Sequence, residues 1–339
     1  MSVTIKDVAK AANVAPSTVS RVISDSPRIS EKTKRKVRQV MKELGYHPNF
    51  IARSLASKSS MVLGIVFPSS GNLAFQNPFF SEVLRGIMTS VNDLHYGIQL
   101  AAGETKQEIL DSVIKMVQGR RVDGIILLYS KYKDEIVSYL QNMDFPFVVI
   151  GKPFQDVEQI THVDNDNVSA AKEGTEYLLN LGHRNIGFIG GNKNLMVTIS
   201  RLEGYKKALS TYQIPIREDY IIYEEFLLSG GKQGVEQIMS VDDPPTALLV
   251  TDDLMSLGVL RTLNEMGKRV PDELSIVSFN NSMFAELASP SLTSIDINIT
   301  ELGKQSVKNL VAKIEEPSEP VKRVIIPHKM IERSSCKEI

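Results

Sequence analysis

Four polar side chains follow Pro16 closely enough to share one face of a short helix: Ser17, Thr18, Ser20 and Arg21. Hydroxyls and a guanidinium are groups with which proteins contact the phosphates and base edges of DNA. Proline is tolerated in a first helical turn, and the apolar residues Val19, Val22 and Ile23 predict that the other face of a helix over 17–24 is buried. These spacings predict a surface for nucleic acid.

A further short helix is predicted directly before this one. Thr4 has the side-chain oxygen of a good N-cap, and Asp7 lies three residues later, where it completes a near capping box. Residues 13–15 form a tight break, so two short helices follow each other with a polar face on the second. This order is typical of a helix-turn-helix, whose second helix enters the major groove of DNA. The alternative is an ordinary helical hairpin.

The distribution of charge favours DNA binding over that alternative. The net charge of the chain is −1, but residues 1–60 contain 12 Lys and Arg against 4 Asp and Glu, and the remainder contains 27 against 36. A basic segment on an acidic body is expected when that segment neutralises phosphates. A solvated basic helix face would not explain why the basic residues gather at one end.

Two more helices are predicted in this basic segment. Ser30 begins the longer one, and Gly45 ends it in the manner of a left-handed cap. Asn49 can then cap a helix of about two turns, whose narrow apolar stripe includes Leu55 and Ala56. So short a helix is unstable alone in water, and we expect it to order only against DNA or a second copy of itself.

Length and composition exclude several classes of protein. A chain of 339 residues has room for two or three domains. No apolar run approaches the ~18 residues of a membrane span, and the N-terminus lacks the apolar core of a signal peptide, so a cytoplasmic protein is expected. Cys336 is the only cysteine, which excludes internal disulfides and thiolate zinc sites. The five histidines are scattered singly, so we expect no metal.

From residue 61 onward, short apolar runs alternate with amphipathic helices. The predicted strands are 61–67, 96–102, 122–128, 146–151, 185–191, 220–223, 246–252 and 275–280. Near-continuous apolar strands separated by helices predict parallel sheets covered on both faces. Two such sets of strands predict two lobes, and the chain is expected to pass between them at 152–166 and 282–299.

These elements predict an all-α helix-turn-helix head followed by a two-lobed α/β core. The helix-turn-helix domain is expected over 1–47, a hinge helix and linker over 48–60, and the core over 61–333. Within the core, the first lobe is predicted to comprise about 61–160 and 282–299. The second lobe is predicted to comprise about 161–281 and 300–333.

Ligands of open α/β sheets bind beyond the carboxyl ends of the strands, and two facing lobes form a cleft that can close. Phe79 and Phe80 follow the first strand and its loop, and are candidates for this cleft or for the core. No Gly-rich phosphate motif or nucleophile elbow lies at the strand ends, so no cofactor is expected. Asp252 and Asp253 are sequence neighbours that do not face each other as a glycosidase pair must, so an enzyme is not expected.

Two segments carry a resemblance to a known family. Residues 4–22 read T-I-K-D-V-A-x-x-A-x-V-x-P-S-T-V-S-R-V, and residues 46–55 read Y-x-P-N-x-x-A-R-S-L. Both are similar to the head of the LacI/GalR family of bacterial transcription regulators, and the resemblance extends along the whole chain. It implies a lambda-repressor-like head, a periplasmic-binding-protein-like core, and a homodimer that reads the half-sites of a near-palindromic operator.

The resemblance also implies roles for residues of the head. Ser17, Thr18 and Arg21 match positions that contact bases and their surroundings. The hinge helices would pair in the minor groove with Leu55 wedged into the central base step, beside the small Ala56. The full set of expected DNA-binding residues is Thr4, Ser17, Thr18, Ser20, Arg21, Asn49, Leu55 and Ala56.

In the core, Arg201 matches the arginine with which the family clamps its effector. Phe226, Asp252 and Asn280 match other pocket positions, and with Phe79 and Phe80 they complete the expected effector site. Asn280 replaces an Asp that is common in the family, which makes a cationic effector less suitable. Aromatic faces with amide, carboxylate and guanidinium groups suit a small neutral sugar. Alternatively, Asp252 could cap the following helix and Arg201 could form a surface ion pair.

Within the family, the chain is most similar to maltose-operon repressors. One alternative is a regulator that uses a phosphorylated phosphocarrier protein as corepressor, but such relatives carry Tyr, Arg and Arg where this chain has Thr300, Lys308 and His47. Lysine does not reproduce the planar fork with which arginine holds a phosphate. A purine-sensing repressor is the other alternative. An extracytoplasmic solute-binding protein would need a signal peptide and no DNA-binding head.

Overall fold

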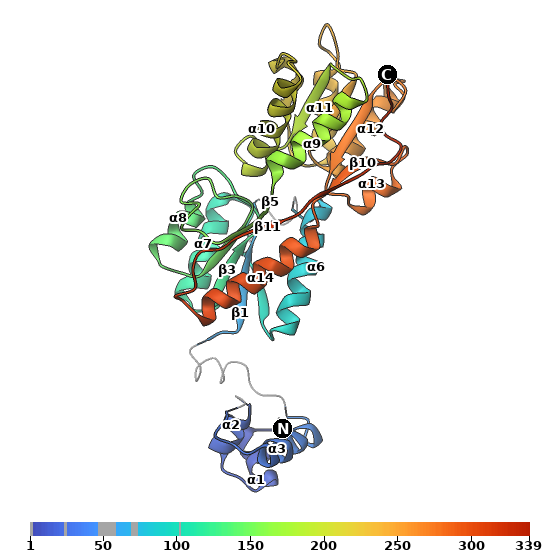
Figure 1. Cartoon of the computed structure of the whole chain (residues 1–339). Helices are drawn as coiled ribbons and strands as arrows, with labels where there is room; N and C mark the ends of the chain where they lie inside the picture. Colours follow the sequence, from blue (N-terminus) through green and yellow to red (C-terminus); the bar gives the residue numbers. More distant parts are fainter. Residues whose placement is uncertain (1–2, 24–25, 47–58, 69–73, 102) are drawn as a thin grey trace. The chain divides into compact units, whose positions relative to one another are not determined.

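The computed structural model describes residues 3–23, 26–46, 59–68, 74–101 and 103–339. The chain divides into two compact units, Met1–Ser60 and Met61–Ile339 (Figure 1). No helix among the described residues is long and apolar enough to cross a membrane.

The first unit contains three described helices, α1 (Ile5–Ala12), α2 (Pro16–Ile23) and α3 (Glu31–Glu43). Their apolar faces meet in one cluster, which includes Val8, Val19, Val22 and Val37. Left-handed backbone at Asn13 (φ 51°) ends α1, and Gly45 (φ 62°) follows α3 as predicted. The helix-turn-helix head is thus confirmed, with α2 beginning at Pro16.

The predicted hinge helix lies largely outside the described residues. Residues 47–58 are not described, and they include His47, Asn49, Leu55 and Ala56. The roles given to these residues remain predictions from the sequence.

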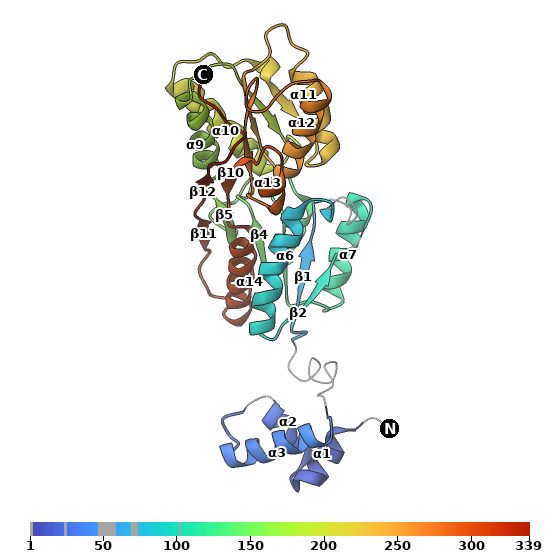
Figure 2. The ribbon, with the colours of Figure 1, turned by 90° about the vertical axis from the view of Figure 1, so that its right-hand side faces the viewer.

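The second unit contains two six-stranded sheets, each in its own lobe (Figure 2). The first sheet has the order β11-β5-β4-β3-β1-β2, and all its pairs are parallel. The second has the order β12-β10-β9-β8-β6-β7, in which only β12 is antiparallel to its neighbour. The two-lobed α/β core is therefore confirmed.

The strands of the first sheet are β1 (Val62–Val66), β2 (Gly97–Leu100), β3 (Gly124–Leu127), β4 (Phe147–Ile150), β5 (His162–Asn165) and β11 (Arg323–Ile326). Those of the second are β6 (Ile186–Gly190), β7 (Ile221–Tyr223), β8 (Ala247–Val250), β9 (Ser275–Phe279), β10 (Thr293–Asp296) and β12 (Lys329–Ile331). The four strands that were not predicted, β5, β10, β11 and β12, are short and carry polar residues, so they lack the apolar runs that revealed the others.

Helices cover both faces of each sheet, as expected for parallel strands. The first lobe carries α6 (Pro78–Asp93), α7 (Lys106–Gln118), α8 (Glu135–Asn142) and α14 (Ile299–Glu315). The second carries α9 (Asn167–Asn180), α10 (Met196–Thr211), the 3-10 turn η1 (Glu218–Tyr220), α11 (Leu228–Ile238), α12 (Asp253–Glu265) and α13 (Met283–Leu287). On the face covered by α6 and α14 in one lobe and α9 and α10 in the other, one apolar cluster runs through both lobes.

The lobe boundaries predicted around the second crossing were wrong. Residues 282–299 were assigned to the first lobe, but they contain α13 and β10, and β10 pairs with β9 and β12 in the second sheet. Residues 300–333 were assigned to the second lobe, but α14 packs on α6, β3, β4 and β5, and β11 pairs with β5. Likewise, β5 belongs to the first sheet. An apolar helix face does not reveal which of two sheets it covers.

The chain crosses between the lobes three times. It leaves β5 for α9 at residue 166, passes from β10 to α14 at 297–298, and runs from β11 to β12 at 327–328. The first two crossings fall within the segments predicted for them. The third was not predicted, because neither β11 nor β12 has a recognisable strand pattern.

Candidate nucleic-acid interface and ligand site

The α2 helix presents the predicted polar face. Ser17, Ser20 and Arg21 are exposed and Thr18 is half-buried, whereas Val19 and Val22 are fully enclosed. Pro16 occupies the first turn, and the backbone carbonyl of Ala15 accepts hydrogen bonds from the N–H groups of Thr18 and Val19. The structure therefore places hydroxyls and a guanidinium on the outer side of the second helix of a helix-turn-helix.

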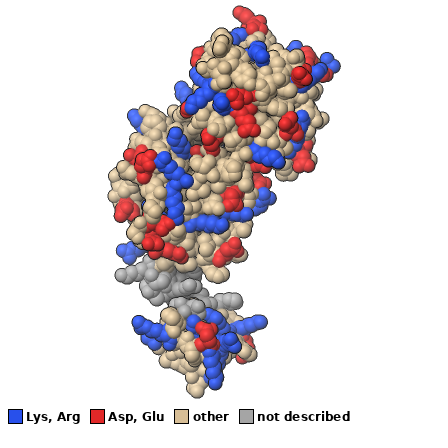
Figure 3. Space-filling model, viewed as in Figure 1, with Lys and Arg blue, Asp and Glu red and all other residues tan. Residues whose placement is uncertain are grey.

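Thr4 and Asp7 fix the start of α1. The Asp7 carboxylate accepts hydrogen bonds from the Thr4 backbone N–H (2.9 Å) and from its hydroxyl (2.7 Å). These bonds hold the pKa of Asp7 below its ordinary value. The Thr4 hydroxyl proton is thus directed into the helix cap, so a phosphate contact there would use backbone N–H groups at the helix N-terminus as donors. Lys and Arg side chains also surround this unit on the face shown in Figure 3.

In the second unit, Asp252 lies at the centre of the predicted ligand site. It follows β8 and caps α12: its Oδ1 accepts from the backbone N–H groups of Leu254 (2.8 Å) and Met255 (3.1 Å). Its Oδ2 accepts from the amides of Asn280 (2.8 Å) and Asn77 (2.9 Å). Asp252 therefore does cap the following helix, as the alternative predicted, and the same carboxylate also accepts hydrogen bonds from two side-chain amides.

Asn77 connects the two lobes at this point. It is the N-cap of α6 in the first lobe, where its Oδ1 accepts from the Phe79 N–H (2.9 Å). Its amide nitrogen donates across to Asp252 and to the Phe226 carbonyl (3.0 Å), both in the second lobe. The sequence identified the stretch after the first strand, but could not show that Asn77 rather than the phenylalanines spans the lobes.

Arg201 is buried, so the alternative prediction that it forms a surface ion pair is wrong. Its Nε donates to the Asn167 Oδ1 (2.9 Å), its Nη1 donates to the Thr251 carbonyl (2.7 Å), and its guanidinium lies 4.1 Å from the centre of the Phe279 ring. Burial lowers its pKa to about 10, against the opposing charges of Asp252, Asp164 and Asp253. Among the described residues Nη2 has no hydrogen-bond acceptor, which leaves it as a donor for a ligand.

Burial dominates the electrostatics of this region. It raises the pKa of Asp252 to about 7, although the Asn77 hydrogen bond acts in the opposite direction. It also raises the pKa of Asp164 to about 6. Burial thus disfavours charge in this region, which makes it better suited to a neutral polar group than to an ion.

The aromatic residues divide between the site and the core. The Phe226 ring lies over the backbone at the end of β6, where a side chain at Gly191 would meet it within 2.6 Å. Phe79 and Phe80 are half-buried against the core, in a perpendicular pair with ring centres 5.2 Å apart, and Phe80 also contacts Phe67. Asn77, Phe226, Asp252 and Asn280 thus meet directly, Arg201 joins them through the backbone at Thr251, and Phe80 is mainly a core residue.

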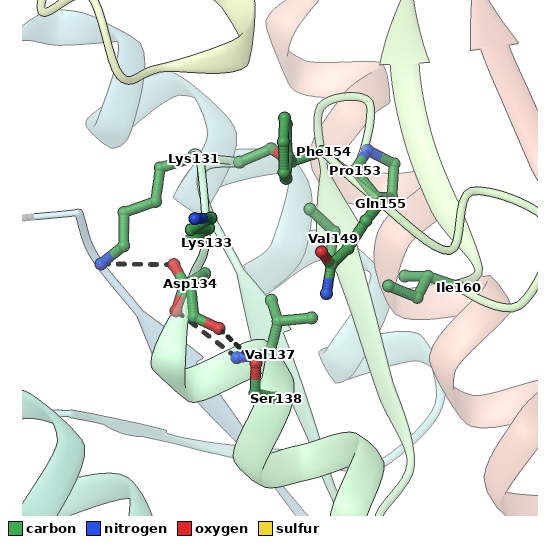
Figure 4. Close-up of a pocket in the computed structure, with 11 residues that line it drawn as sticks. Lys131, Lys133, Asp134, Val137, Ser138, Val149, Pro153, Phe154, Gln155 and Ile160 are labelled. Carbon is green, nitrogen blue, oxygen red and sulfur yellow. Dashed lines mark hydrogen bonds and ion pairs between the residues drawn. The ribbon is translucent and has the colours of Figure 1, made fainter.

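A separate pocket lies in the first lobe, beyond β3 and β4 and beside the start of α8 (Figure 4). Asp134 caps α8 and pairs with the Lys131 ammonium at 3.3 Å. The Phe154 ring, which lies 4.2 Å from that of Tyr132, borders the pocket. The predicted ligand residues do not line this pocket, so it is distinct from the site around Asp252.

Comparison with family models finds two matches. Residues 4–49 match the model described as bacterial regulatory proteins, lacI family, and residues 175–336 match that of a periplasmic binding protein-like domain. Among curated proteins, the HTH-type transcriptional regulator MalR of Streptococcus pneumoniae is 40% identical over 98% of this chain and 100% of its own length. Catabolite control protein A of Priestia megaterium is 32% identical over 99% and 100%.

Two solved structures show the same architecture over almost the whole chain. The lac repressor dimer bound to operator and the anti-inducer ONPF superposes with a TM-score of 0.84 at 26% identity, covering 99% of this chain and 100% of that one. The complex of the transcriptional regulator CelR with cellobiose superposes with a TM-score of 0.78 at 29% identity, covering 98% and 99%.

Proposed function

Because the chain belongs to the LacI family of bacterial regulatory proteins, we propose that it is a cytoplasmic, homodimeric repressor of a sugar-utilisation operon. In this proposal, α2 of each subunit reads one half of a near-palindromic operator. A sugar bound between the lobes of the second unit sets the affinity for that operator. The observation that carries the proposal is the pairing of an exposed polar α2 face with an interlobe site in one chain.

The chemistry of the interlobe site supports a neutral sugar. Arg201 Nη2 is available as a donor, the amides of Asn77 and Asn280 can exchange partners with hydroxyl groups, and the Phe226 ring offers a face to sugar C–H groups. Of the similar solved structures, the CelR complex contains cellobiose and the lac repressor complex contains the anti-inducer ONPF. The MalR relative and the resemblance to maltose-operon repressors favour maltose or a short maltodextrin as the effector.

The site offers little support for catalysis. Both oxygens of Asp252 already accept hydrogen bonds from protein donors, and those of Asp253 accept from the hydroxyls of Ser278 and Ser294 and the N–H of Ser282. Carboxylates committed in this way are not placed as the acid and base of a glycosidase. We therefore propose a binding protein without enzymatic activity.

Control by a phosphorylated phosphocarrier protein has weaker support, despite the similarity to catabolite control protein A. Thr300 on α14 accepts a hydrogen bond from Arg85 Nη2 (3.0 Å), and Lys308 supplies a point charge in place of a guanidinium fork. A purine effector would have to form hydrogen bonds through its ring nitrogens with the residues of the interlobe site.

The test is fluorescence anisotropy of the full-length protein on a labelled palindromic operator from its own upstream region, at fixed salt. Maltose, cellobiose, glucose, hypoxanthine, guanine and a phosphorylated phosphocarrier protein are added separately. A change in operator affinity with maltose supports the proposal, in whichever direction it occurs. A response to a purine alone, or tighter binding only with a phosphorylated phosphocarrier protein, would assign the chain to one of the alternatives.

A further inference from the structure

Asn165 lies where all three crossings between the lobes meet. It is the last residue of β5, so the first crossing begins directly after it. Its amide nitrogen donates to the Ile297 carbonyl (2.9 Å) in the second crossing. It also donates to the Ile326 carbonyl (2.9 Å), directly before the third crossing. One amide group therefore ties three segments that are far apart in the sequence.

The surroundings of Asn165 make these bonds strong constraints. The residue is only 3% exposed, and both protons of its side-chain amide are used. A buried carbonyl that loses its donor carries a desolvation penalty, so neither Ile297 nor Ile326 can move away from Asn165 without cost. Figure 2 shows β5 and β11 with β10 and β12 in this region between the two lobes.

The same segment is connected to the ligand site through Asn167, two residues further along the chain. The Asn167 Oδ1 accepts from Arg201 Nε, and its amide donates to the Asp164 Oδ1 (2.9 Å). Arg201, which is expected to clamp the effector, thus bonds directly to the start of α9 and, through Asn167, to Asp164. These two positions flank Asn165 in the sequence. A displacement of Arg201 is transmitted to the first crossing over two hydrogen bonds.

We propose that Asn165 is a positioning residue that joins the three crossings into one hinge, so that a change at Arg201 rotates the lobes as rigid bodies. Without its amide, each crossing adjusts separately, and the sugar site closes without moving the first lobe as a whole. The regulatory half of this inference rests on the proposed function, whereas the joining of the crossings does not.

Two variants and a control test the inference. Asn165→Leu keeps the approximate volume but removes both donors, and Asn165→Ala leaves space in which water can hydrate the two carbonyls if the leucine variant does not fold. Thr175→Val is the control, because Thr175 is fully buried on α9 and, among the described residues, its hydroxyl bonds within that helix alone, to the Ala171 carbonyl. It removes a buried hydrogen bond without touching a crossing.

The first readout is hydrogen exchange of the full-length protein without ligand, in segments 296–299 and 326–329. We expect the Asn165 variants to speed exchange at least about fivefold in both segments together, and Thr175→Val to leave both unchanged. Faster exchange in one segment only, or in neither, would overturn the joining of the crossings.

The second readout is the ratio of operator affinities with and without maltose, beside the maltose Kd from calorimetry. We expect the ratio to fall at least about fivefold towards 1 in the Asn165 variants while the maltose Kd stays within about threefold of wild type. A ratio equal to that of Thr175→Val would overturn the regulatory role. If wild-type protein shows no response to maltose, the proposed effector is wrong, and hydrogen exchange alone then decides the hinge.

Discussion

At the scale of single residues, Asp252 shows how one side chain can combine a structural and a functional task. Its four hydrogen bonds end β8, start α12 and bring together Asn77 of one lobe and Asn280 of the other. The sequence predicted an effector contact with a helix cap as the alternative, and spacing alone could not show that the residue bridges the lobes. A sugar hydroxyl that binds Asp252 must replace one of the two amides.

The titration of Asp252 has a defined effect on stability. Its pKa is about 7 in the folded protein and near 3.8 unfolded, so the folded state binds this proton more tightly. The resulting stabilisation is full below the unfolded value and is lost as pH rises through about 7. Between pH 5 and pH 8, the wild-type protein should therefore lose on the order of 1 kcal/mol or more of unfolding free energy through this carboxyl group. Asp252→Asn has no carboxyl group at this position, so the variant should not show that loss. Urea unfolding at several pH values measures it.

The comparison with wild type isolates Asp252, because other buried groups are common to both proteins. Asp164, whose pKa is raised to about 6, also lowers the unfolding free energy as pH rises. His162 and His183, whose pKa values are lowered by burial, raise the unfolding free energy as pH rises. An unchanged dependence on pH in the variant would contradict the assignment.

Arg201→Ala should weaken maltose binding by at least about tenfold and abolish the sugar response, because no other described side chain brings a guanidinium into this site. Operator binding without sugar should persist, since Arg201 belongs to the second unit. Calorimetry and anisotropy measure the two effects. Arg184→Ala is the matched control, because Arg184 bonds the Leu179 and His183 carbonyls in the same lobe, away from the site. Equal losses in both variants would remove the specific role of Arg201.

At the scale of elements, the sequence predicts those whose pattern is strong. The apolar runs reveal eight of the strands, and the spacing of Val19 and Val22 reveals α2. The strands β10 (TSID) and β12 (KMI) remain hidden, because three or four residues with polar members carry no usable period. The lobe to which α14 belongs depends on contacts with α6 and β3 that are distant in sequence. Asn165 and Asn167 were missed as well, because a hydrogen bond across three crossings leaves no local signal.

The α2 helix carries the prediction for DNA. Arg21→Ala should reduce operator affinity by ~1–3 kcal/mol and reduce binding to unrelated DNA much less, if Arg21 contacts a base edge. Anisotropy on the two DNAs at the same salt measures the difference. Arg28→Ala, at an exposed position in the loop before α3, should cause small and similar losses on both. The same similar losses for Arg21→Ala would reduce its role to a phosphate contact.

At the scale of the whole molecule, the chain combines a basic head with an acidic, two-lobed core. A sugar changes DNA binding only through its differential affinity for two states of the protein, typically worth ~1–3 kcal/mol. A change between two such states would have to alter the interlobe bonds of Asn77 or the hinge that we propose around Asn165. Residues 47–58, which include the predicted hinge helix, lie between them and the head in the sequence.

The measurement that tests this account most directly is the reciprocity of the two bindings. The maltose Kd is measured by calorimetry with and without saturating operator, and the operator Kd by anisotropy with and without saturating maltose. Since coupling between two sites is reciprocal, the account predicts that both constants change by the same factor, of about 5–150. Maltose binding that is identical with and without operator would contradict the claim that the interlobe site controls the head.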